Sequence, residues 1–254
     1  MPVIIFIFGL IIGSFLNVCI YRIPRGISIV YPGSHCPYCK KPIKPYDNIP
    51  VISYLILRGR CRYCQAKIFW RYPFVELLTA ALFVLLYLKF GLGLDLIKYI
   101  LFTALIIICG FIDLDFQIIP NSITLPGIIL GLLLNYRQEG YVKEILGGTV
   151  ICAGILWIFR ALGMWIRKQE MMGLGDIKLA AMIGAFLGLS KGLLSLFIGV
   201  FLGILVWTIL IVLRVKTRRD PIPFGFFMAI GCLLAVFWGE IIVRWYWGLF
   251  KLNY

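Results

Sequence analysis

Charged residues are scarce in this chain of 254 residues: only 14% are Asp, Glu, Lys or Arg, whereas 62% are hydrophobic. A soluble domain carries about a quarter charged residues, so the composition excludes a water-soluble globule. It also excludes a disordered chain, which needs low hydrophobicity and a high net charge. The mean hydropathy of +0.99 indicates an integral membrane protein.

Histidine is almost absent, and His35 is the only one in the chain. The chain therefore has no histidine other than His35 that could form a catalytic Ser-His or Cys-His pair. Acidic residues are also few, 11 against 25 Lys and Arg, which gives a formal net charge of +14. In a soluble chain this excess would suggest a nucleic-acid partner. In a membrane protein, basic residues gather in cytoplasmic loops and report the orientation instead.

Apolar segments long enough to cross a bilayer recur along the chain. About 20 mainly apolar residues span the hydrocarbon core, so the sequence predicts an all-α polytopic membrane protein with about eight transmembrane helices. They lie near residues 3–21, 73–90, 96–113, 122–136, 145–166, 177–189, 192–213 and 222–248. The first has no preceding basic segment and no small-residue cleavage site, so we expect it to be retained rather than removed as a signal peptide.

The basic residues are unevenly divided between the two ends of these spans. Residues 22–72 hold ten, and if this loop is cytoplasmic the same face receives seven more. These seven are Arg167, Lys168, Lys178, Arg214, Lys216, Arg218 and Arg219. The opposite face holds seven, and Arg160 lies within a span. The bias predicts a cytoplasmic loop and both termini outside. It also removes the main support for a nucleic-acid partner, because the charges are spread over several helix ends.

Four of the eight cysteines form two pairs in the loop, Cys36-Pro-Tyr-Cys39 and Cys61-Arg-Tyr-Cys64. Two such C-x2-C pairs supply the four thiolates of a tetrahedral structural zinc site, so all four cysteines are candidate ligands. The alternative, disulfides or free thiols, is disfavoured in the reducing cytoplasm. A loop of about 50 residues has too small a core to fold unaided, so we expect Zn²⁺ to stabilise it.

Ionisable side chains within apolar spans are costly, which makes each one a candidate functional residue. They are Glu76, Asp113, Asp115, Asp176 and Glu240. Asp113 and Asp115 lie two residues apart, about 200° around a helix, and cannot face the same way. Asp113 is predicted to share a helical face with Gln117 and Pro120. Glu76 either contacts the substrate or the loop, or caps its helix among lipid headgroups, which is the role that we favour.

Asp176 lies in Gly173-Leu-Gly175-Asp-Ile-Lys178, where the sixth predicted span begins. The two glycines allow another chain to approach the backbone closely, whereas the alternative role for Asp176 is a helix N-cap. Lys178 either tunes the charge of this carboxylate or extends to lipid headgroups. Asp113 and Asp176 come from different spans at the same predicted depth, and such paired carboxyl groups can share a proton and activate water for peptide hydrolysis. The competing possibility is a proton-coupled transporter with an Asp relay and a zinc-held regulatory loop.

These motifs resemble those of type IV prepilin peptidases, bifunctional membrane aspartyl proteases of the GxGD type. The matching stretches follow in order along nearly the whole chain. They are residues 13–18 with 21–24, the two cysteine pairs, 47–50, 72–76, 113–121, 173–179 and 223–225. The family pattern places its first catalytic Asp seven residues before a Pro, which selects Asp113 rather than Asp115.

The resemblance implies that Asp113 and Asp176 form the catalytic pair, with Gly173, Gly175 and Lys178 in the active-site loop. The implied substrates are type IV prepilins and pseudopilins, cleaved after the Gly that ends a short basic leader. The implied location is the cytoplasmic face of a bacterial inner membrane. Members with the cysteine loop then methylate the new N-terminal residue, usually Phe, using S-adenosylmethionine. No glycine-rich fingerprint marks a pocket for this cofactor.

Three segments follow from these assignments. Residues 1–21 form the first transmembrane helix, residues 22–72 a zinc-binding, methyltransferase-associated cytoplasmic loop, and residues 73–254 the peptidase domain. The expected partners are prepilin-like substrates and the lipid bilayer, with no nucleic acid.

Overall fold

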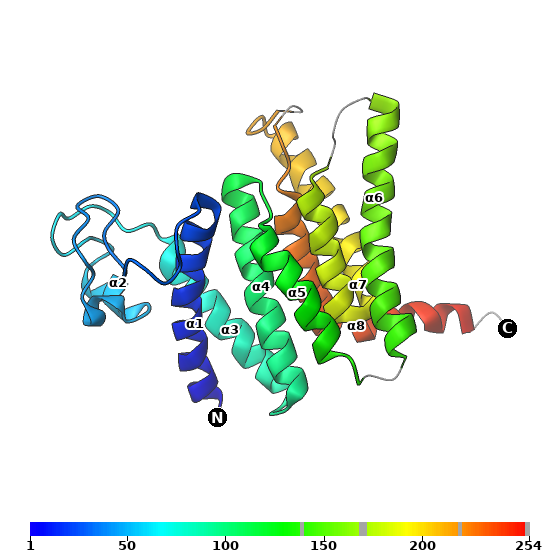
Figure 1. The fold of residues 1–254 in the computed structure, drawn as a ribbon, viewed down its shortest axis with the longest axis horizontal. Coiled ribbons are helices and arrows are strands. Elements are labelled where there is room, and N and C mark those ends of the chain that lie inside the picture. Colours follow the sequence, from blue (N-terminus) through cyan, green and yellow to red (C-terminus); the bar gives the residue numbers. More distant parts are fainter. Residues whose placement is uncertain (138–139, 168–171, 218–219, 252–254) are drawn as a thin grey trace. The chain divides into compact units, whose positions relative to one another are not determined.

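The computed structural model describes residues 1–137, 140–167, 172–217 and 220–251. The chain forms two compact units, Met1–Ile100 and Leu101–Tyr254. Their regular structure is helical (Figure 1), and the described ranges contain no β-strand beyond two isolated bridges. The prediction of an all-α polytopic membrane protein is therefore confirmed. Three basic residues that contributed to the predicted orientation, Lys168, Arg218 and Arg219, lie outside the described ranges.

Six helices of the described residues are long and apolar enough to cross a membrane. These spans cover Pro2–Arg25, Arg71–Phe90, Leu94–Phe116, Val142–Ile166, Leu174–Val212 and Phe224–Trp245. A shorter apolar helix, α5, covers Asn121–Leu134. The longest helix, α7 (Leu174–Val212), is broken at Gly188. Since α7 holds two of the predicted spans, the eight predicted spans correspond to eight helical segments.

The first unit is built on the packed pair α1 (Pro2–Arg22) and α3 (Arg71–Phe90). Gly9 and Gly13 lie against α3, where added Cβ atoms would come within 2.5 and 2.7 Å of its backbone. Membrane helices pack this closely where small residues recur every four positions. Contact between α1 and α3 therefore depends on these two glycines.

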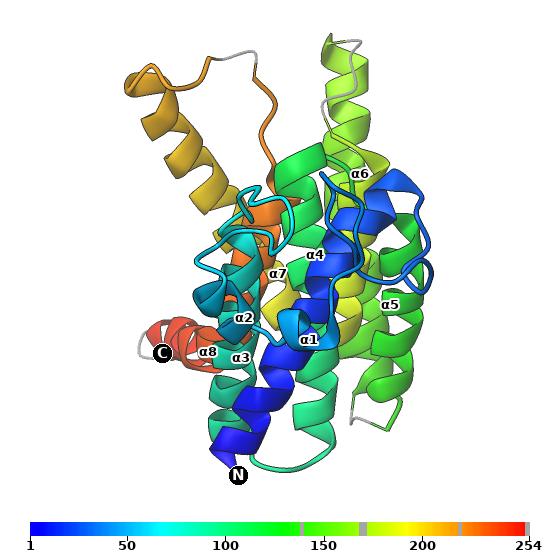
Figure 2. The same cartoon turned by 90° about the vertical axis from the view of Figure 1, so that its left-hand side faces the viewer.

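An insertion, residues 23–70, connects α1 to α3 and appears in front of both helices in Figure 2. Its regular elements are the short helices η1 (Ile23–Arg25), η2 (Pro45–Asn48) and α2 (Ile52–Ile56). These elements bury no large hydrophobic side chain of their own. The insertion consequently depends on other contacts for its stability. The first turns of α4 (Leu94–Phe116) complete the unit.

The second unit is a bundle in which α7 packs against α5, α6 (Gly147–Arg167) and α8 (Phe224–Lys251). The π-helix η3 (Val142–Leu146) leads into α6. Phe102 of α4 and Phe186 of α7 are fully buried and stack with ring centroids 4.7 Å apart. Figure 1 shows that α4 ends, and α5, α7 and α8 begin, toward the same end of this bundle.

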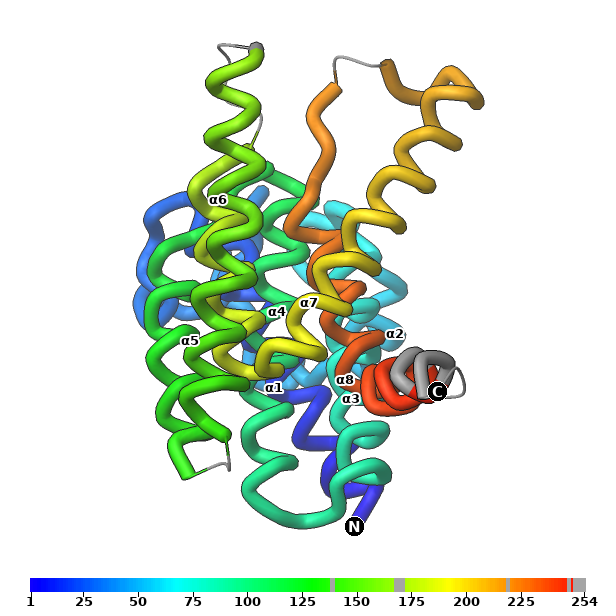
Figure 3. Tube along the Cα trace, turned by 90° about the vertical axis from the view of Figure 1, so that its right-hand side faces the viewer, coloured from blue at the N-terminus to red at the C-terminus, as the bar shows by residue number. Residues whose placement is uncertain are grey.

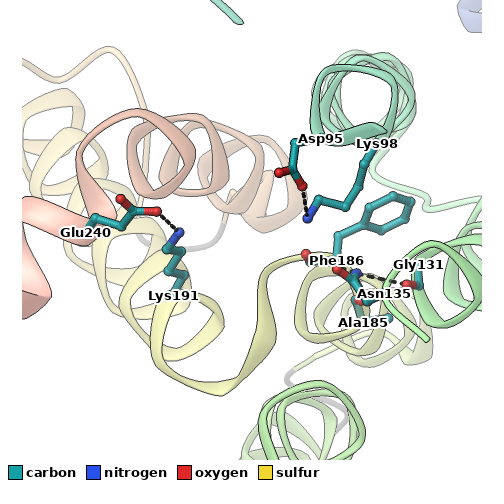
Figure 4. A network of polar contacts seen from close by, with 8 residues as sticks. All are labelled: Asp95, Lys98, Gly131, Asn135, Ala185, Phe186, Lys191 and Glu240. Carbon is teal, nitrogen blue, oxygen red and sulfur yellow. Dashed lines mark hydrogen bonds and ion pairs between the residues drawn. The ribbon is translucent and has the colours of Figure 1, made fainter. Parts of the chain in front are cut away.

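The helix α7 turns back on itself at Gly188, where φ is 77° and ψ is −176° (Figure 3). A Cβ placed on Gly192 would lie 3.5 Å from the Cα of Gly184, although an unbroken helix would separate these residues by about 12 Å. The left-handed φ at Gly188 is one that glycine adopts without a steric penalty. Beyond the break, an ion pair of 2.6 Å between Lys191 and Glu240 links α7 to α8 (Figure 4).

A buried amide supports the backbone on the first side of this break. The Nδ2 atom of Asn135 donates hydrogen bonds to the carbonyl oxygens of Ala185 and Phe186, at 3.0 and 3.5 Å (Figure 4). Asn135 is only 2% exposed. Carbonyl groups at a helix end need such partners because their own helix supplies none.

Candidate active site

Asp113 lies in the last turn of α4 and is 5% exposed. Its Oδ2 atom accepts a hydrogen bond of 3.1 Å from the backbone N–H of Phe226, and the N–H of Gly225 also donates to the carboxyl group. Both donors belong to the first turn of α8, where N–H groups have no partner within their own helix. The start of α8 therefore holds the carboxyl group of Asp113 in place.

Asp176 lies in the first turn of α7, three residues after the N-cap residue Gly173. Its carboxyl group accepts a hydrogen bond from the N–H of Gly173. This is the contact that the N3 side chain of a capping box makes with the N-cap residue. The alternative interpretation of Asp176 as the N-cap itself is therefore wrong. The carboxyl groups of Asp176 and Asp113 are close enough for their charges to interact. The structure thus brings together the two carboxyl groups that the sequence paired.

Ile119 packs between two glycines that flank these carboxyl groups. A Cβ on Gly175 would lie 2.9 Å from the Cβ of Ile119, and one on Gly225 would lie 2.9 Å from its Cδ1. The Cβ on Gly225 would also lie 3.1 Å from Oδ2 of Asp113. Since neither position has room for a side chain, the two glycines allow α7 and α8 to begin next to the end of α4.

The helix that carries Asp113 does not continue to Pro120, as a shared helical face with that residue would require. It stops at Phe116 because Gln117 adopts a φ of 56° and its N–H closes the last turn on the carbonyl of Asp113, at 2.9 Å. Pro120 is instead the N-cap of α5. The prediction that Asp113, Gln117 and Pro120 share one helical face is therefore wrong. The separation of Asp113 from Asp115 is confirmed, since Asp115 is exposed and Asp113 is buried.

The cysteine pairs of the insertion converge on one point. The Sγ atoms of the four residues lie within 4.8 Å of one another, and those of Cys36 and Cys64 are 3.8 Å apart. Four thiolates around a Zn²⁺ ion at about 2.3 Å would be about 3.8 Å apart, so the cluster fits such an ion. Cys36, Cys39, Cys61 and Cys64 are all free of disulfides. No second cluster of His, Cys, Asp or Glu that could hold a metal occurs among the described residues.

The two cysteine pairs share one backbone pattern. In each, the N–H of the first cysteine donates to the carbonyl five residues later, at 3.0 Å for Cys36 and 2.9 Å for Cys61. Its carbonyl accepts the N–H four residues later, at 2.9 and 3.0 Å. Those donors, Lys40 and Gln65, have nearly equal positive φ values of 58° and 59°. This repeated turn aims both thiols of each pair inward.

Crowding of the thiols affects their titration. Backbone N–H groups of Cys64 and Tyr63 lower the pKa of the Cys61 thiol to about 7. At Cys64 the N–H of Ala66 acts in the same direction, but desolvation and the neighbouring thiols outweigh it and raise the pKa of this thiol to about 11. Ionisation of one thiol thus opposes ionisation of the next. A divalent cation removes the opposition, because thiols that coordinate a metal are deprotonated.

Comparison with known proteins extends along most of the chain. Residues 7–90 match the Bacterial Peptidase A24 N-terminal domain, and residues 99–208 match the Type IV leader peptidase family. A protein of Aeromonas hydrophila named prepilin leader peptidase/N-methyltransferase is 39% identical over 273 residues, or 96% of this chain and 92% of that protein. The chain belongs to the type IV leader peptidase family.

Other leader peptidases of the same name are similar over the full length. The protein of Legionella pneumophila is 35% identical over 274 residues, 98% of this chain and 95% of its own. That of Bacillus subtilis (strain 168) is 35% identical over 246 residues, 96% of each chain. No solved structure matches the chain. The family resemblance found in the motifs is confirmed, and the protein is an enzyme of a protease family.

Two basic residues position the segments around Asp176 in this leader peptidase. The Nζ of Lys178 donates to Oδ1 of Asn121 at the start of α5, at 2.8 Å. The guanidinium of Arg160 in α6 donates to the carbonyl of Met172, at 2.7 Å, directly before the N-cap of α7. In the sequence analysis Arg160 was placed within a span without a role, although a charge within an apolar span was the signal that could have found it.

Glu76 belongs to a separate polar site in the first unit. It is 8% exposed, and its Oε2 accepts a hydrogen bond of 2.8 Å from the N–H of Val51 in the insertion. The hydroxyl of Ser14 in α1 donates to the same carboxyl group. The favoured interpretation, a helix cap among lipid headgroups, is therefore wrong, and the alternative contact with the loop is confirmed.

Proposed function

We propose that this leader peptidase is a membrane aspartyl endopeptidase that cleaves type IV prepilins and pseudopilins after the Gly that ends their short basic leader. The observation that carries the proposal is that the carboxyl groups of Asp113, in the last turn of α4, and Asp176, in the first turn of α7, lie close enough for their charges to interact. The substrate class rests on the relatives, which are named prepilin leader peptidase/N-methyltransferase.

In the proposed mechanism Asp113 and Asp176 share one proton, because two adjacent carboxyl groups do not both ionise readily. The ionised group removes a proton from water as the water oxygen adds to the scissile carbonyl carbon. The protonated group gives its proton to the carbonyl oxygen. The first group then protonates the leaving amine as the C–N bond breaks, and the second regains a proton as the carbonyl re-forms. Both carboxyl groups return to their starting states.

We further propose that Cys36, Cys39, Cys61 and Cys64 bind a structural Zn²⁺ ion. The Sγ separations and the repeated backbone turn support this assignment. When bound, the ion would tie two distant parts of the insertion together and compensate for its small core. The bound ion would be structural rather than catalytic, because four thiolates leave no coordination position open for water or substrate.

Residues 22–72 are proposed to serve a second activity, the N-methylation of the new N-terminal residue, usually Phe. S-adenosylmethionine would supply the methyl group. The name of the relatives supports this activity. In this division residues 1–21 form the first transmembrane helix and residues 73–254 the peptidase domain.

The proposed location is the bacterial inner membrane, with the insertion and both catalytic Asp residues at its cytoplasmic face. The concentration of Lys and Arg in residues 22–72 supports this orientation.

The test is a reaction of the purified protein in lipid nanodiscs with a prepilin and S-adenosylmethionine, followed by mass spectrometry. We expect a product that has lost the leader up to its terminal Gly and carries one added methyl group. An intact prepilin together with solute-dependent proton flux would favour the competing transporter.

A further inference from the structure

A cavity of about 720 Å³ lies in the first unit between α1 and the insertion. Ligand pockets in proteins commonly enclose roughly 300–1,000 Å³ and combine apolar walls with a few polar groups. The apolar walls here include Phe15 and Val18 from α1 and Ile49 from the insertion. Its polar lining comes from four residues, Ser14, Arg22, Ser34 and Asn48.

One wall of this cavity is a strained turn. The N–H of Ile52 donates to the carbonyl of Pro50, at 2.6 Å, and Val51 between them has a φ of 61° and a ψ of −49°. This is the γ-turn with a positive central φ, the rarer and more strained of the two forms. A β-branched residue is especially unfavourable there. Such strain persists only where the surroundings enforce it, and it gathers at ligand sites.

The buried carboxyl group of Glu76 enforces the turn. Its hydrogen bond to the N–H of Val51 holds the strained residue against α3. The hydroxyl of Ser14, which lines the cavity, donates to the same carboxyl group. The carboxylate of Glu76 is therefore separated from the cavity by the hydroxyl group of Ser14.

Arg22 supplies the opposite charge at another part of the cavity. It is 6% exposed, and its guanidinium donates to the carbonyls of Ser28 and Gly33, at 2.9 and 3.2 Å. Among the described residues that line the cavity, Arg22 alone is charged. These hydrogen bonds fix the guanidinium, so the cavity combines apolar walls with one fixed cation and one nearby anion.

We propose that this cavity binds S-adenosylmethionine, and that Glu76 is the positioning residue that holds its strained wall. The inference rests on the proposed methyl-transfer function. The apolar walls suit the adenosine ring system, Arg22 suits the carboxylate of the methionyl part, and the Ser14–Glu76 pair suits the cationic sulfonium. Glu76 acts through Ser14 and Val51 rather than by touching the ligand.

The first test fills the cavity and measures binding rather than activity. The full-length protein in nanodiscs is titrated with S-adenosylmethionine by calorimetry. Ile49→Trp is expected to weaken binding by about tenfold or more, because a larger side chain takes up the ligand volume. Ile56→Trp is the matched control, since Ile56 is 70% exposed and does not line the cavity. It is expected to bind like the wild type.

The second test separates the charge of Glu76 from its hydrogen bond. Glu76→Gln keeps an acceptor for Val51 but removes the negative charge. It is expected to weaken binding of S-adenosylmethionine more than binding of S-adenosylhomocysteine, which lacks the sulfonium charge. A purely structural role of Glu76 would weaken both ligands equally.

The third test uses the strain at Val51. Glu76→Leu removes the acceptor, so the turn is expected to relax and both ligands to bind about tenfold more weakly. Adding Val51→Gly is expected to restore part of the affinity, because glycine adopts a φ of 61° without strain. Zinc content and prepilin cleavage are expected to stay unchanged in both variants, which distinguishes this effect from unfolding of the insertion.

Three results would overturn the inference: unaltered binding in Ile49→Trp, equal weakening of both ligands in Glu76→Gln, or no recovery with Val51→Gly. A phospholipid retained by the wild type and lost from Ile49→Trp, seen by native mass spectrometry with unchanged methyl-donor affinity, would assign the cavity to lipid. If the wild type neither binds a methyl donor nor methylates its product, the proposed methyl-transfer function itself is wrong.

Discussion

The two central carboxyl groups are held by different parts of the backbone. Asp113 receives N–H groups from the start of another helix, α8, whereas Asp176 bonds to the N-cap residue of its own helix. Displacement of α8 therefore changes the surroundings of Asp113 directly. The chemistry of the pair depends on contacts between elements far apart in the chain as well as on the two Asp residues.

Both carboxyl groups are required for the proposed hydrolysis, since one must accept a proton while the other donates one. Asp113→Asn and Asp176→Asn are each expected to abolish cleavage of a prepilin, measured by mass spectrometry of the products. The matched control is Asp115→Asn, which is expected to remain within about threefold of the wild type because Asp115 is exposed. An active Asp113→Asn, or an Asp115→Asn that loses more activity, would contradict the assignment.

The position of the Asp113 carboxyl group can be tested by adding a single methyl group beside it. Gly225→Ala would place a methyl group 3.1 Å from Oδ2 of Asp113 and 2.9 Å from Ile119. Because small displacements of a catalytic group are costly, we expect kcat to fall by about a hundredfold with a smaller change in KM. Gly154→Ala in α6 is the control, since its Cβ would meet nothing within 4 Å. Equal kinetics for the two variants would show that the carboxyl group tolerates the added methyl.

At the residue scale, the sequence could predict the acids but not their partners. Asp113 and Asp176 stand out because carboxyl groups are rare in apolar spans. The N–H groups of Gly225 and Phe226 belong to the backbone, which carries no side-chain signal for the contact. Glu76 was misassigned for a similar reason, because its partner is the backbone N–H of Val51 in a turn formed by tertiary contacts.

At the scale of elements, the insertion shows how little regular structure a small module needs when four thiols converge. Its helices are short, and its two cysteine pairs are shaped by the same hydrogen-bonded turn. The sequence predicted the cluster because the C-x2-C spacing fixes which thiols can face one point. It could not predict the end of α4, which depends on the left-handed conformation of Gln117.

Removal of two of the proposed zinc ligands should separate the two proposed activities. Cys36→Ser combined with Cys61→Ser is expected to lose bound zinc, measured by elemental mass spectrometry, because two of four ligands are gone. Methylation is expected to suffer more than cleavage, since the insertion loses its cross-link while the Asp pair lies in the other unit. Cys19→Ala, outside the cluster, should retain zinc. The same zinc content in the wild type and the double variant would refute the metal site.

At the scale of the whole molecule, the unusual composition has a simple physical origin. Many large hydrophobic side chains are exposed on the spans, such as Leu88 at 66% and Phe197 at 70%, because lipid rather than water surrounds them. Hydropathy predicts such spans well because the bilayer sets their length. The net charge of +14 arises mainly from Lys and Arg residues on the face that is proposed to be cytoplasmic.

This orientation can be tested with two cysteine substitutions of almost equal exposure. Val30 in the insertion is 84% exposed and Leu94, at the start of α4, is 82% exposed. In intact cells, a membrane-impermeant maleimide is expected to label Leu94→Cys, whereas Val30→Cys should react only after the inner membrane is permeabilised. Unmodified protein serves as the background control for the native thiols. Labelling in the reverse order would invert the proposed topology.

The break at Gly188 has a consequence for the parity of membrane crossings. If α7 crossed the bilayer only once, α8 would begin on the face opposite to the one where α4 ends. The N–H groups of Gly225 and Phe226 could not then reach Asp113. The reversal at one glycine makes the number of crossings between Asp176 and Gly225 even, so both return to the same face as Asp113. A backbone conformation near the far end of the bundle thereby decides whether the carboxyl pair can be assembled at all.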